Sequence, residues 1–404
     1  MLRNNGRHNF RSPYGGVQVP PFILDFAGTQ TLNSGITFSR STTGTYYNSS
    51  GVLSTAAIDI PRFTYNPSTL VSLGLLEEQS STNLVTYSRD FSNAAWAKSV
   101  LAITPNLILA PDGSTTGTLV TCTGVGNNFI GLSTAITTTS GTPNTKTIYF
   151  KAGTATVVGF GDGSAGQQNE WGNFNLSTGV ATAQNGATAS MVNVGNGWYR
   201  CSASLTGTGT LTQFRIYQGT LYPGTGGTGT FYIWEAQLEK LSFPTSPIFT
   251  TSTAVTRAAD LCPLTVGSWY GVTTGSVVAE FITVSTSGTP RIVGGTPSSK
   301  ALIELSSNAA SMFDGSTTIS TANTATANIT QKIAATWDGT NGKICLNAGT
   351  VVTGSQANGF ADLTTIGVGY NSTSNNNFIN GTIAKISFYN YVLSSAQMQI
   401  LTGL

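Results

Sequence analysis

The chain has 404 residues, and its 18 basic and 16 acidic side chains make up only 8% of the sequence, against about 25% in an average soluble protein. A Ser/His/Asp triad or a histidine-rich metal site would have to use the single histidine, His8, and the net charge of +2 gives no general attraction for nucleic acid. With 10% aromatic residues and 47 glycines, the chain is too apolar for disorder and poorly suited to long helices. We therefore expect a folded, all-β, multidomain protein.

Residues 1–80 consist of short β-prone segments separated by glycine and proline, such as the run from Pro20 to Phe26 and the alternating Ile36 and Phe38. They predict an extended amino-terminal attachment arm with short hairpins. The sequence shows no apolar core of a secretory signal and no stretch of about 18 apolar residues that could span a bilayer. We expect synthesis in the cytoplasm without a signal peptide, and no membrane insertion.

The start of this arm is locally basic, because Arg3, Arg7 and Arg11 precede the first acidic residue, Asp25. Two readings remain open for this cluster. It is either a solvated tail or a peg that docks on an acidic surface of a partner, in which case the three arginines make the contact.

Residues 81–250 contain longer runs with stricter alternation. In one of them, Ile148 and Phe150 face one way while Tyr149 and Lys151 face the other. Similar runs follow, separated by turns rich in glycine, threonine and asparagine, and nothing between them has a helical period over ten or more residues. This pattern predicts an antiparallel β-sandwich of the jelly-roll type.

A polar segment at residues 251–263 separates this region from a second strand-rich region and predicts a linker. Residues 264–404 again show short alternating strands and predict a second antiparallel sandwich. Only the segment from Leu393 to Leu401 has a helical pattern, and Ser394 is suited to cap its start. One short helix is therefore expected near the carboxyl terminus.

Three stretches resemble known protein families. Residues 74–98, GLLEEQSSTNLVTYSRDFSNAAWAK, and residues 231–260, FYIWEAQLEKLSFPTSPIFTTSTAVTRAAD, resemble the start and end of a jelly-roll, carbohydrate-binding-like module of tailed-bacteriophage virion proteins. Residues 378–401, FINGTIAKISFYNYVLSSAQMQIL, are similar to the closing strands of laminin-G-like, concanavalin-like sandwiches. The chain thus looks like a virion structural protein with two such domains.

The resemblance implies a fibre, decoration or cement protein on the head or tail of a virion, joined to other virion proteins through the amino-terminal arm. It also implies a homo-oligomer, specifically a trimer. The neutral surface favours weak adhesion to glycans of the host cell, where many linked sites gain avidity. The alternatives are a receptor-binding tail fibre or spike adhesin that recognises host polysaccharide, and a glycan depolymerase.

One stretch, GDGSAGQQNEWGNFN, has the composition of a glycan-binding site. An aromatic ring beside amide and carboxylate groups suits a sugar, which presents both apolar C–H faces and hydroxyl groups. The candidate glycan-binding residues are Trp171, Asp162, Gln168, Asn169, Glu170 and Asn173. The other reading is a polar loop held by a buried tryptophan.

The acidic residues do not predict an enzyme. Glycoside hydrolysis needs two carboxyl groups about 5–10 Å apart, and Glu235 and Glu239 lie four residues apart on one strand, about 13 Å. Glu280 and Glu304 could meet across neighbouring strands, although single outward-facing carboxylates are the commoner arrangement. We therefore expect no catalytic activity.

No cofactor is expected either. A structural Ca²⁺ is the one alternative, with Asp112, Asp314, Asp338 or Glu235 as ligands. The three aspartates each precede a glycine, and Asp-Gly turns need no metal to explain them. The four cysteines are scattered without metal-binding spacing, and no chemistry is assigned to them.

Overall fold

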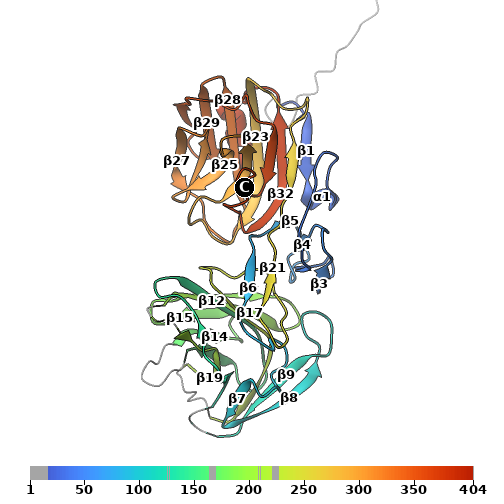
Figure 1. Cartoon of the computed structure of the whole chain (residues 1–404), viewed down its shortest axis with the longest axis vertical. Coiled ribbons are helices and arrows are strands. Elements are labelled where there is room, and N and C mark those ends of the chain that lie inside the picture. The colour runs from blue at the N-terminus through green and yellow to red at the C-terminus, as the bar shows by residue number, and fades with distance from the viewer. Residues whose placement is uncertain are drawn as a thin grey trace, which may run out of the picture. The chain divides into compact units, whose positions relative to one another are not determined.

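The computed structural model describes residues 17–124, 126, 128–162, 170–207, 209, 211–220 and 227–403. The chain forms two compact units, each built almost entirely from antiparallel strands (Figure 1). Unit 1 consists of Met1–Ser39, Leu73–Glu78 and Leu261–Leu404, and unit 2 consists of Arg40–Ser72 and Gln79–Asp260. The prediction of an all-β chain with antiparallel β-sandwiches is confirmed.

Unit 1 contains two antiparallel sheets. The first sheet runs in the order β30 (Val352–Ser355), β29 (Asn341–Leu346), β28 (Gln331–Asp338), β23 (Thr274–Thr283), β32 (Gly381–Tyr389), β5 (Ser72–Glu77). A further strand, β1 (Phe22–Asp25), pairs with the same edge of β32 as β5 does. The second sheet runs in the order β22 (Pro263–Thr265), β31 (Thr365–Val368), β24 (Arg291–Thr296), β25 (Lys300–Ser306), β26 (Ala309–Phe313), β27 (Thr318–Thr324).

The alternation along β23 shows why this strand has one core face and one outer face. Val277, Ala279 and Phe281 are buried, whereas Val278 and Glu280 are only half-buried. Because successive side chains of a strand point to opposite faces, the first three contribute to the core and the other two lie on the outer face of the first sheet.

The short helix predicted near the carboxyl terminus is present as α2 (Ser395–Thr402). Ser394 is its N-cap, and Ser394 and Gln397 form a reciprocal capping box. Met398 is fully buried and packs with Ala334 and Cys345 on the outer face of the first sheet. The only other helix in the described part of the chain is the single turn α1 (Phe26–Thr29), and neither helix is long and apolar enough to cross a membrane.

Unit 2 is a second sandwich. One sheet runs in the order β15 (Val180–Ala183), β14 (Glu170–Asn175), β13 (Val157–Gly161), β19 (Arg215–Gln218), β10 (Phe129–Leu132), β7 (Trp96–Ser99). The other runs in the order β16 (Thr188–Asn193), β17 (Trp198–Thr206), β12 (Pro143–Ala152), β20 (Gly229–Glu239), β9 (Gly117–Cys122), β8 (Leu101–Ile108). Ile148 and Phe150 of β12 lie in the core of the unit, while Tyr149 faces the opposite side, as the alternation predicts.

Small two-stranded sheets complete unit 2. They are β2 (Gly44–Tyr47) with β3 (Leu53–Ala56), β6 (Ser81–Asn83) with β21 (Val255–Arg257), and β11 (Ile136–Thr137) with β18 (Leu211–Thr212). Leu53 of β3 and Tyr47 of β2 pack with Trp198 and Trp234 on the outer face of the second sheet. The short strand β4 (Phe63–Tyr65) lies beside β2, where the Tyr47 N–H donates to the Thr64 hydroxyl at 3.2 Å.

The first 80 residues are distributed differently from the single arm that the sequence predicts. Strand β1 and helix α1 belong to unit 1, where Leu24 and Phe26 are fully buried, while strands β2 to β4 belong to unit 2. The physical reason is hydrophobic burial, because side chains as apolar as these gain more from a core than from a solvated arm.

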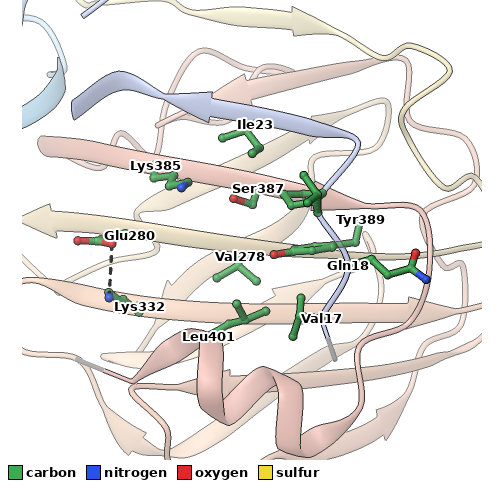
Figure 2. A pocket seen from close by; sticks show the side chains of 12 residues that line it. Val17, Gln18, Ile23, Val278, Glu280, Lys332, Lys385, Ser387, Tyr389 and Leu401 are labelled. Atoms are coloured by element: carbon green, nitrogen blue, oxygen red, sulfur yellow. Dashed lines mark ion pairs between the residues drawn. The ribbon is translucent and has the colours of Figure 1, made fainter. Parts of the chain in front are cut away.

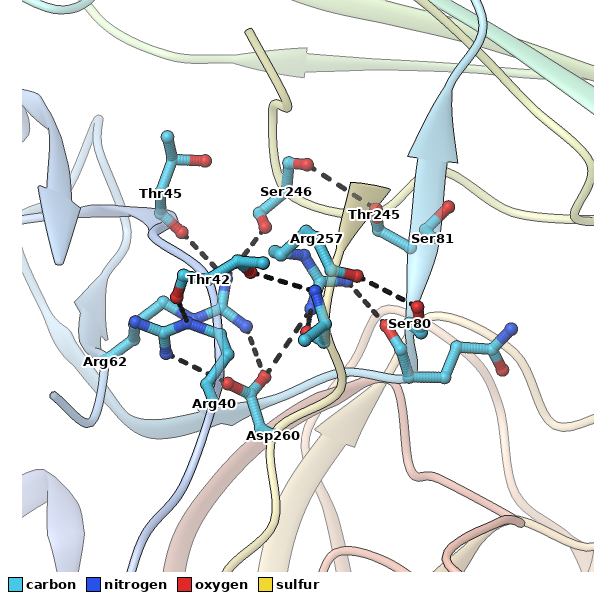
Figure 3. Close-up of polar contacts among 12 residues, drawn as sticks. Arg40, Thr42, Thr45, Arg62, Ser80, Ser81, Thr245, Ser246, Arg257 and Asp260 are labelled. Carbon is cyan, nitrogen blue, oxygen red and sulfur yellow. Dashed lines mark hydrogen bonds and ion pairs between the residues drawn. The ribbon is translucent and has the colours of Figure 1, made fainter. Parts of the chain in front are cut away.

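A cluster of three arginines around one carboxylate holds the ends of unit 2 together (Figure 3). Asp260, the last residue of the unit, accepts from Arg40 Nη1 at 3.1 Å and from Arg62 Nη2, and Arg257 Nη1 lies 3.8 Å away. All four side chains are at most 1% exposed. Burial lowers the pKa of Arg40, and the Asp260 carboxylate opposes that shift. The predicted linker at residues 251–263 is therefore anchored in this structure by Arg257 and Asp260.

Candidate functional site

The structure places Trp171 in the core of unit 2. Its side chain is 2% exposed, and the Lys146 ammonium lies 3.7 Å from the centroid of its ring. Lys146 is itself fully buried, forms an ion pair with Asp162 and donates to the Gln213 carbonyl at 2.6 Å. A ring that is 2% exposed leaves little surface for contact with a sugar in this structure.

The other described members of that candidate site make internal contacts. Asn173 accepts from the Tyr217 hydroxyl at 3.2 Å and donates to the Thr220 carbonyl at 2.8 Å. Asp162 is engaged by Lys146, and burial lowers the pKa of that lysine to about 8 although Asp162 opposes the shift. Glu170 is the first residue of β14.

The remaining candidates lie outside the described residues. Gln168 and Asn169 belong to the gap at residues 163–169, and Arg3, Arg7 and Arg11 belong to residues 1–16. Both the glycan site around Trp171 and the virion contact through the arginines therefore stay predictions.

Four charged side chains form a row across the outer face of the first sheet of unit 1. The strand register places Glu280 of β23 opposite Lys332 of β28 on one side and opposite Lys385 of β32 on the other. Lys385 lies in turn opposite Asp25 of β1. Because directly opposed residues share a face of the sheet, the charge alternates in sign from strand to strand. We call Lys332, Glu280, Lys385 and Asp25 the charge ladder.

The contacts within the charge ladder are long. Lys332 Nζ lies 3.5 Å from Glu280 Oε2, and Lys385 Nζ lies 4.0 Å from Asp25 Oδ2. These side chains are 24–44% exposed. Two members have a further partner, since Lys332 donates to the Gly403 carbonyl at 3.1 Å and Asp25 accepts from the Gly28 N–H at 2.8 Å. The ladder is thus partly solvated, with lysine N–H groups and carboxylate lone pairs still available.

Three members of the ladder, Lys332, Glu280 and Lys385, line one end of a groove of about 390 Å³ (Figure 2). Its floor carries Val278, Ser387 and Tyr389, which follow the ladder along β23 and β32. Leu401 of α2 forms one wall, and residues 17–20, which lead into β1, form another part of the lining. The groove therefore combines an apolar floor with a charged end, within the size range of small-ligand sites.

Tyr389 lies beneath the groove, because its side chain is only 4% exposed and packs in the cluster with Ala334 and Met398. Its ring lies beside Val278 (Figure 2) and meets Tyr391 edge to face at a centroid distance of 5.6 Å. Burial raises the pKa of Tyr389 to about 12; the hydroxyl is protonated at neutral pH even at the ordinary tyrosine value of about 10 and can donate a hydrogen bond. Tyr391 in turn accepts from the Gln18 N–H at 3.2 Å, which ties the segment before β1 to this face.

Sequence reasoning singled out only Glu280 of this groove, and for a different role. The sequence does carry a signal for the other charged residues of the groove. Each of the three runs AEFI, QKIAA and IAKIS has one charged residue at an outward position, namely Glu280, Lys332 and Lys385. Alternation alone assigns these residues to an outer face, but the strand order and register are needed to place them in one row.

The acidic pairs considered for hydrolysis are not formed. Glu280 lies on the first sheet of unit 1, whereas Glu304 lies on β25 of the second sheet, with its Oε2 3.2 Å from Arg291 Nε. Glu239 is buried and accepts from Ser81 Oγ at 2.6 Å and from the Thr245 N–H at 3.0 Å. Glu235 is buried as well and accepts from Ser88 Oγ at 3.0 Å. The alternative of a Glu280–Glu304 pair is therefore wrong, because their strands belong to different sheets.

The residues named as alternative Ca²⁺ ligands have other contacts or stand apart. Asp112 accepts from the Ser114 N–H at 3.0 Å, and Asp314 accepts from the backbone N–H groups of Ser316, Thr317 and Asn358 at 2.6–2.9 Å. Asp338 is exposed at the end of β28. Among the described residues, no group of three or more His, Cys, Asp or Glu side chains gathers as a metal site.

Comparisons with known proteins give distant likenesses only. No protein-family model matches the sequence, and no curated protein matches it. Among solved structures, the chain is similar to the carbohydrate-binding module CBM40 of the Ruminococcus gnavus IT-sialidase bound to α2,3-sialyllactose, at 16% identity and a TM-score of 0.29 over 32% of this chain and 83% of that one.

Two further solved structures show likenesses of the same order. Domain 4 of the Geobacillus stearothermophilus arabinanase AbnA, in complex with arabinotriose, is 14% identical with a TM-score of 0.30 over 36% of this chain and 73% of that one. Domains LG4-5 of the mouse laminin α1 chain are 12% identical with a TM-score of 0.22 over 68% of this chain and 88% of that one. Likenesses of this size do not extend to function.

Proposed function

We propose that this chain is an adhesion protein displayed on a virion, and that the groove of unit 1 binds carbohydrate. The observation that carries the proposal is the groove itself. It combines the partly exposed apolar side chains of Val17, Val278 and Leu401 with a rim of hydrogen-bonding groups. A sugar ring needs both, because its C–H face packs on apolar surface while its hydroxyls need fixed donors and acceptors.

The virion part of the proposal rests on the sequence. Residues 74–98 and 231–260 resemble segments of tailed-phage virion proteins, and the basic cluster of Arg3, Arg7 and Arg11 is suited to contact another virion protein. A trimeric fibre, decoration or cement protein would present several copies of the groove. Weak sugar contacts then gain avidity, since linked sites bind as intramolecular events. The second candidate is a receptor-binding tail fibre or spike, in which binding of host polysaccharide by the groove is the main function.

The carbohydrate-binding function is tested by filling the groove. A Ser387→Tyr variant adds an aromatic ring at the floor, and the matched Thr353→Tyr variant adds the same ring at an exposed position of β30 on the same sheet. On a glycan array and on host cells, we expect wild type and Thr353→Tyr to bind and Ser387→Tyr to lose binding. Equal binding by both variants, with equal thermal stability, would contradict the assignment of the groove.

The virion contact is tested by a short deletion. Residues 1–16 can be removed without touching β1, whose pairing with β32 from Phe22 to Asp25 contributes to unit 1. We expect this deletion, and an Arg3→Gln/Arg7→Gln/Arg11→Gln triple variant, to lose incorporation into particles while the melting temperature stays unchanged. Normal incorporation of both proteins would refute the anchoring role.

A further inference from the structure

We infer that the groove selects uncharged, polyhydroxylated saccharides and that the charge ladder is the element that recognises them. This inference rests on the proposed carbohydrate-binding function of the groove and goes beyond it by naming the class of ligand. The alternative is an acidic saccharide, such as one carrying a carboxylate, held by the two lysines.

The sign pattern of the ladder argues for an uncharged ligand. Lys332, Glu280 and Lys385 line the groove with charges of alternating sign, and Asp25, outside the lining, lies 4.0 Å from Lys385 Nζ and offsets part of its charge. A ligand carboxylate near either lysine would also lie near Glu280, which stands directly opposite both. Attraction and repulsion would then largely cancel, so the ladder gives an anionic ligand little net advantage.

The chemistry of a hydroxyl group fits the same pattern. A hydroxyl both donates and accepts, so it can donate to a carboxylate and accept from an ammonium group at the same time. Neighbouring hydroxyls of one sugar ring could therefore engage Lys332, Glu280 and Lys385 in succession. Each contact would be a charge-assisted hydrogen bond, which is stronger than a bond between neutral groups.

The distances within the ladder leave room for such contacts. The separations of 3.5 Å for Lys332–Glu280 and 4.0 Å for Lys385–Asp25 exceed the usual range of about 2.7–3.2 Å for an N–H···O hydrogen bond. Exposed pairs of this kind contribute little to stability, so the sheet does not depend on them. With half-buried Val278 next along β23 and Leu401 of α2 beside it in the lining, a ring bound at the ladder would continue onto apolar surface.

The experiment compares ligands, salt and two isosteric variants. Binding of neutral oligosaccharides and of oligosaccharides containing uronic or sialic acids is measured by calorimetry at about 50 mM and about 500 mM salt, since added salt screens charge–charge attraction. The variants are Glu280→Gln and Lys385→Gln. The matched controls are Asp338→Asn, an exposed carboxylate of the same sheet, and Lys343→Gln on β29, neither of which lines the groove.

If the groove selects uncharged saccharides, both Glu280→Gln and Lys385→Gln should weaken binding of a neutral oligosaccharide by about fivefold. Each variant replaces a charge-assisted hydrogen bond by a neutral one. The affinity of wild type for the neutral oligosaccharide should change little with salt, and the two control variants should bind it with the affinity of wild type. Thermal unfolding of each variant separates loss of binding from loss of fold.

Two results would overturn the inference, and they differ in what they say of the proposed function. Preferred binding of acidic saccharides, weakened by salt and by Lys385→Gln but strengthened by Glu280→Gln, would leave carbohydrate binding intact and refute the class of ligand. Binding of no saccharide by wild type, on the array or by calorimetry, would refute the proposed function and this inference together.

Discussion

Glu235 makes the stability of unit 2 depend on pH in a way that can be measured. It is the extra residue of a β-bulge in β20, where the partners of Ile148 and Tyr149 on β12 are Ala236 and Trp234. Its φ of 47° lies in the left-handed region, which is uncommon for a residue other than glycine. Its carboxyl group is buried, with the Ser88 hydroxyl as hydrogen-bond donor to one oxygen.

The direction of the effect follows from the pKa. Burial raises the pKa of Glu235 to about 8 from an unperturbed 4.5, although the hydrogen bond from Ser88 opposes the shift. The folded state therefore holds this proton over a pH range in which the unfolded state has lost it. The stabilising contribution is complete below pH 4.5 and is lost as the pH rises to about 8. A difference of about 3.5 pKa units corresponds to at most about 5 kcal/mol.

The assay is urea unfolding between pH 5 and pH 8.5, followed by tryptophan fluorescence. The free energy of unfolding of wild-type unit 2 should fall by several kcal/mol across this range, on the order of the limit above. In Glu235→Gln the side chain stays neutral and its amide oxygen can still accept from Ser88, so most of the slope should disappear. Glu280→Gln, a partly exposed carboxylate of unit 1, should keep the wild-type slope for unit 2. A Glu235→Gln profile parallel to that of wild type would refute the reasoning.

Two further predictions concern buried carboxylates. Asp260→Asn should destabilise unit 2 by about 3–5 kcal/mol in urea unfolding, because it removes the charge that Arg40, Arg62 and Arg257 surround; a loss below about 1 kcal/mol would show that other partners compensate. Burial alone would raise the pKa of Asp314, but N–H groups of Thr317, Asn358 and Ser316 lower it to about 2. Asp314→Asn should therefore cost about 2 kcal/mol at neutral pH, and the difference from wild type should vanish as the pH falls from 3.8 to about 2. An equal difference at pH 2 and pH 7 would contradict this.

The strands and the helix could be predicted because their signals are local. Alternation from Ile148 to Lys151 sets the two faces of β12, and Ser394 with Gln397 sets the start of α2. Trp171 is different, because whether a tryptophan in a polar stretch is exposed depends on what packs over it. Here the residue is Lys146, from a strand about 25 positions earlier in the chain, and an ion pair with Asp162 allows that lysine to be buried.

The assignment of the first 80 residues could not be obtained from the sequence for a related reason. Short segments such as β1 have the same local pattern whether they stand alone or join a sheet. Whether such a segment joins a sheet depends on an available strand edge. Here one edge of β32 pairs with β1 from Phe22 to Asp25 and with β5 from Leu75 to Glu77. An unpaired strand edge exposes a row of hydrogen-bonding groups, so covering it stabilises the sandwich.

Because charged residues are rare in this chain, a row of four of them on one face of a sheet needs an explanation. Several of the 34 charged side chains are used inside the units, as in the pairs Arg291–Glu304 and Lys146–Asp162 and in the cluster around Asp260. The surface is therefore more neutral than the composition alone suggests. Against that background, four charges in one row, three of them lining a groove, are a local concentration. Cross-strand pairs at 3.5 and 4.0 Å contribute too little to folding to account for it. The proposed role in binding would account for both their position and the long separations within the pairs.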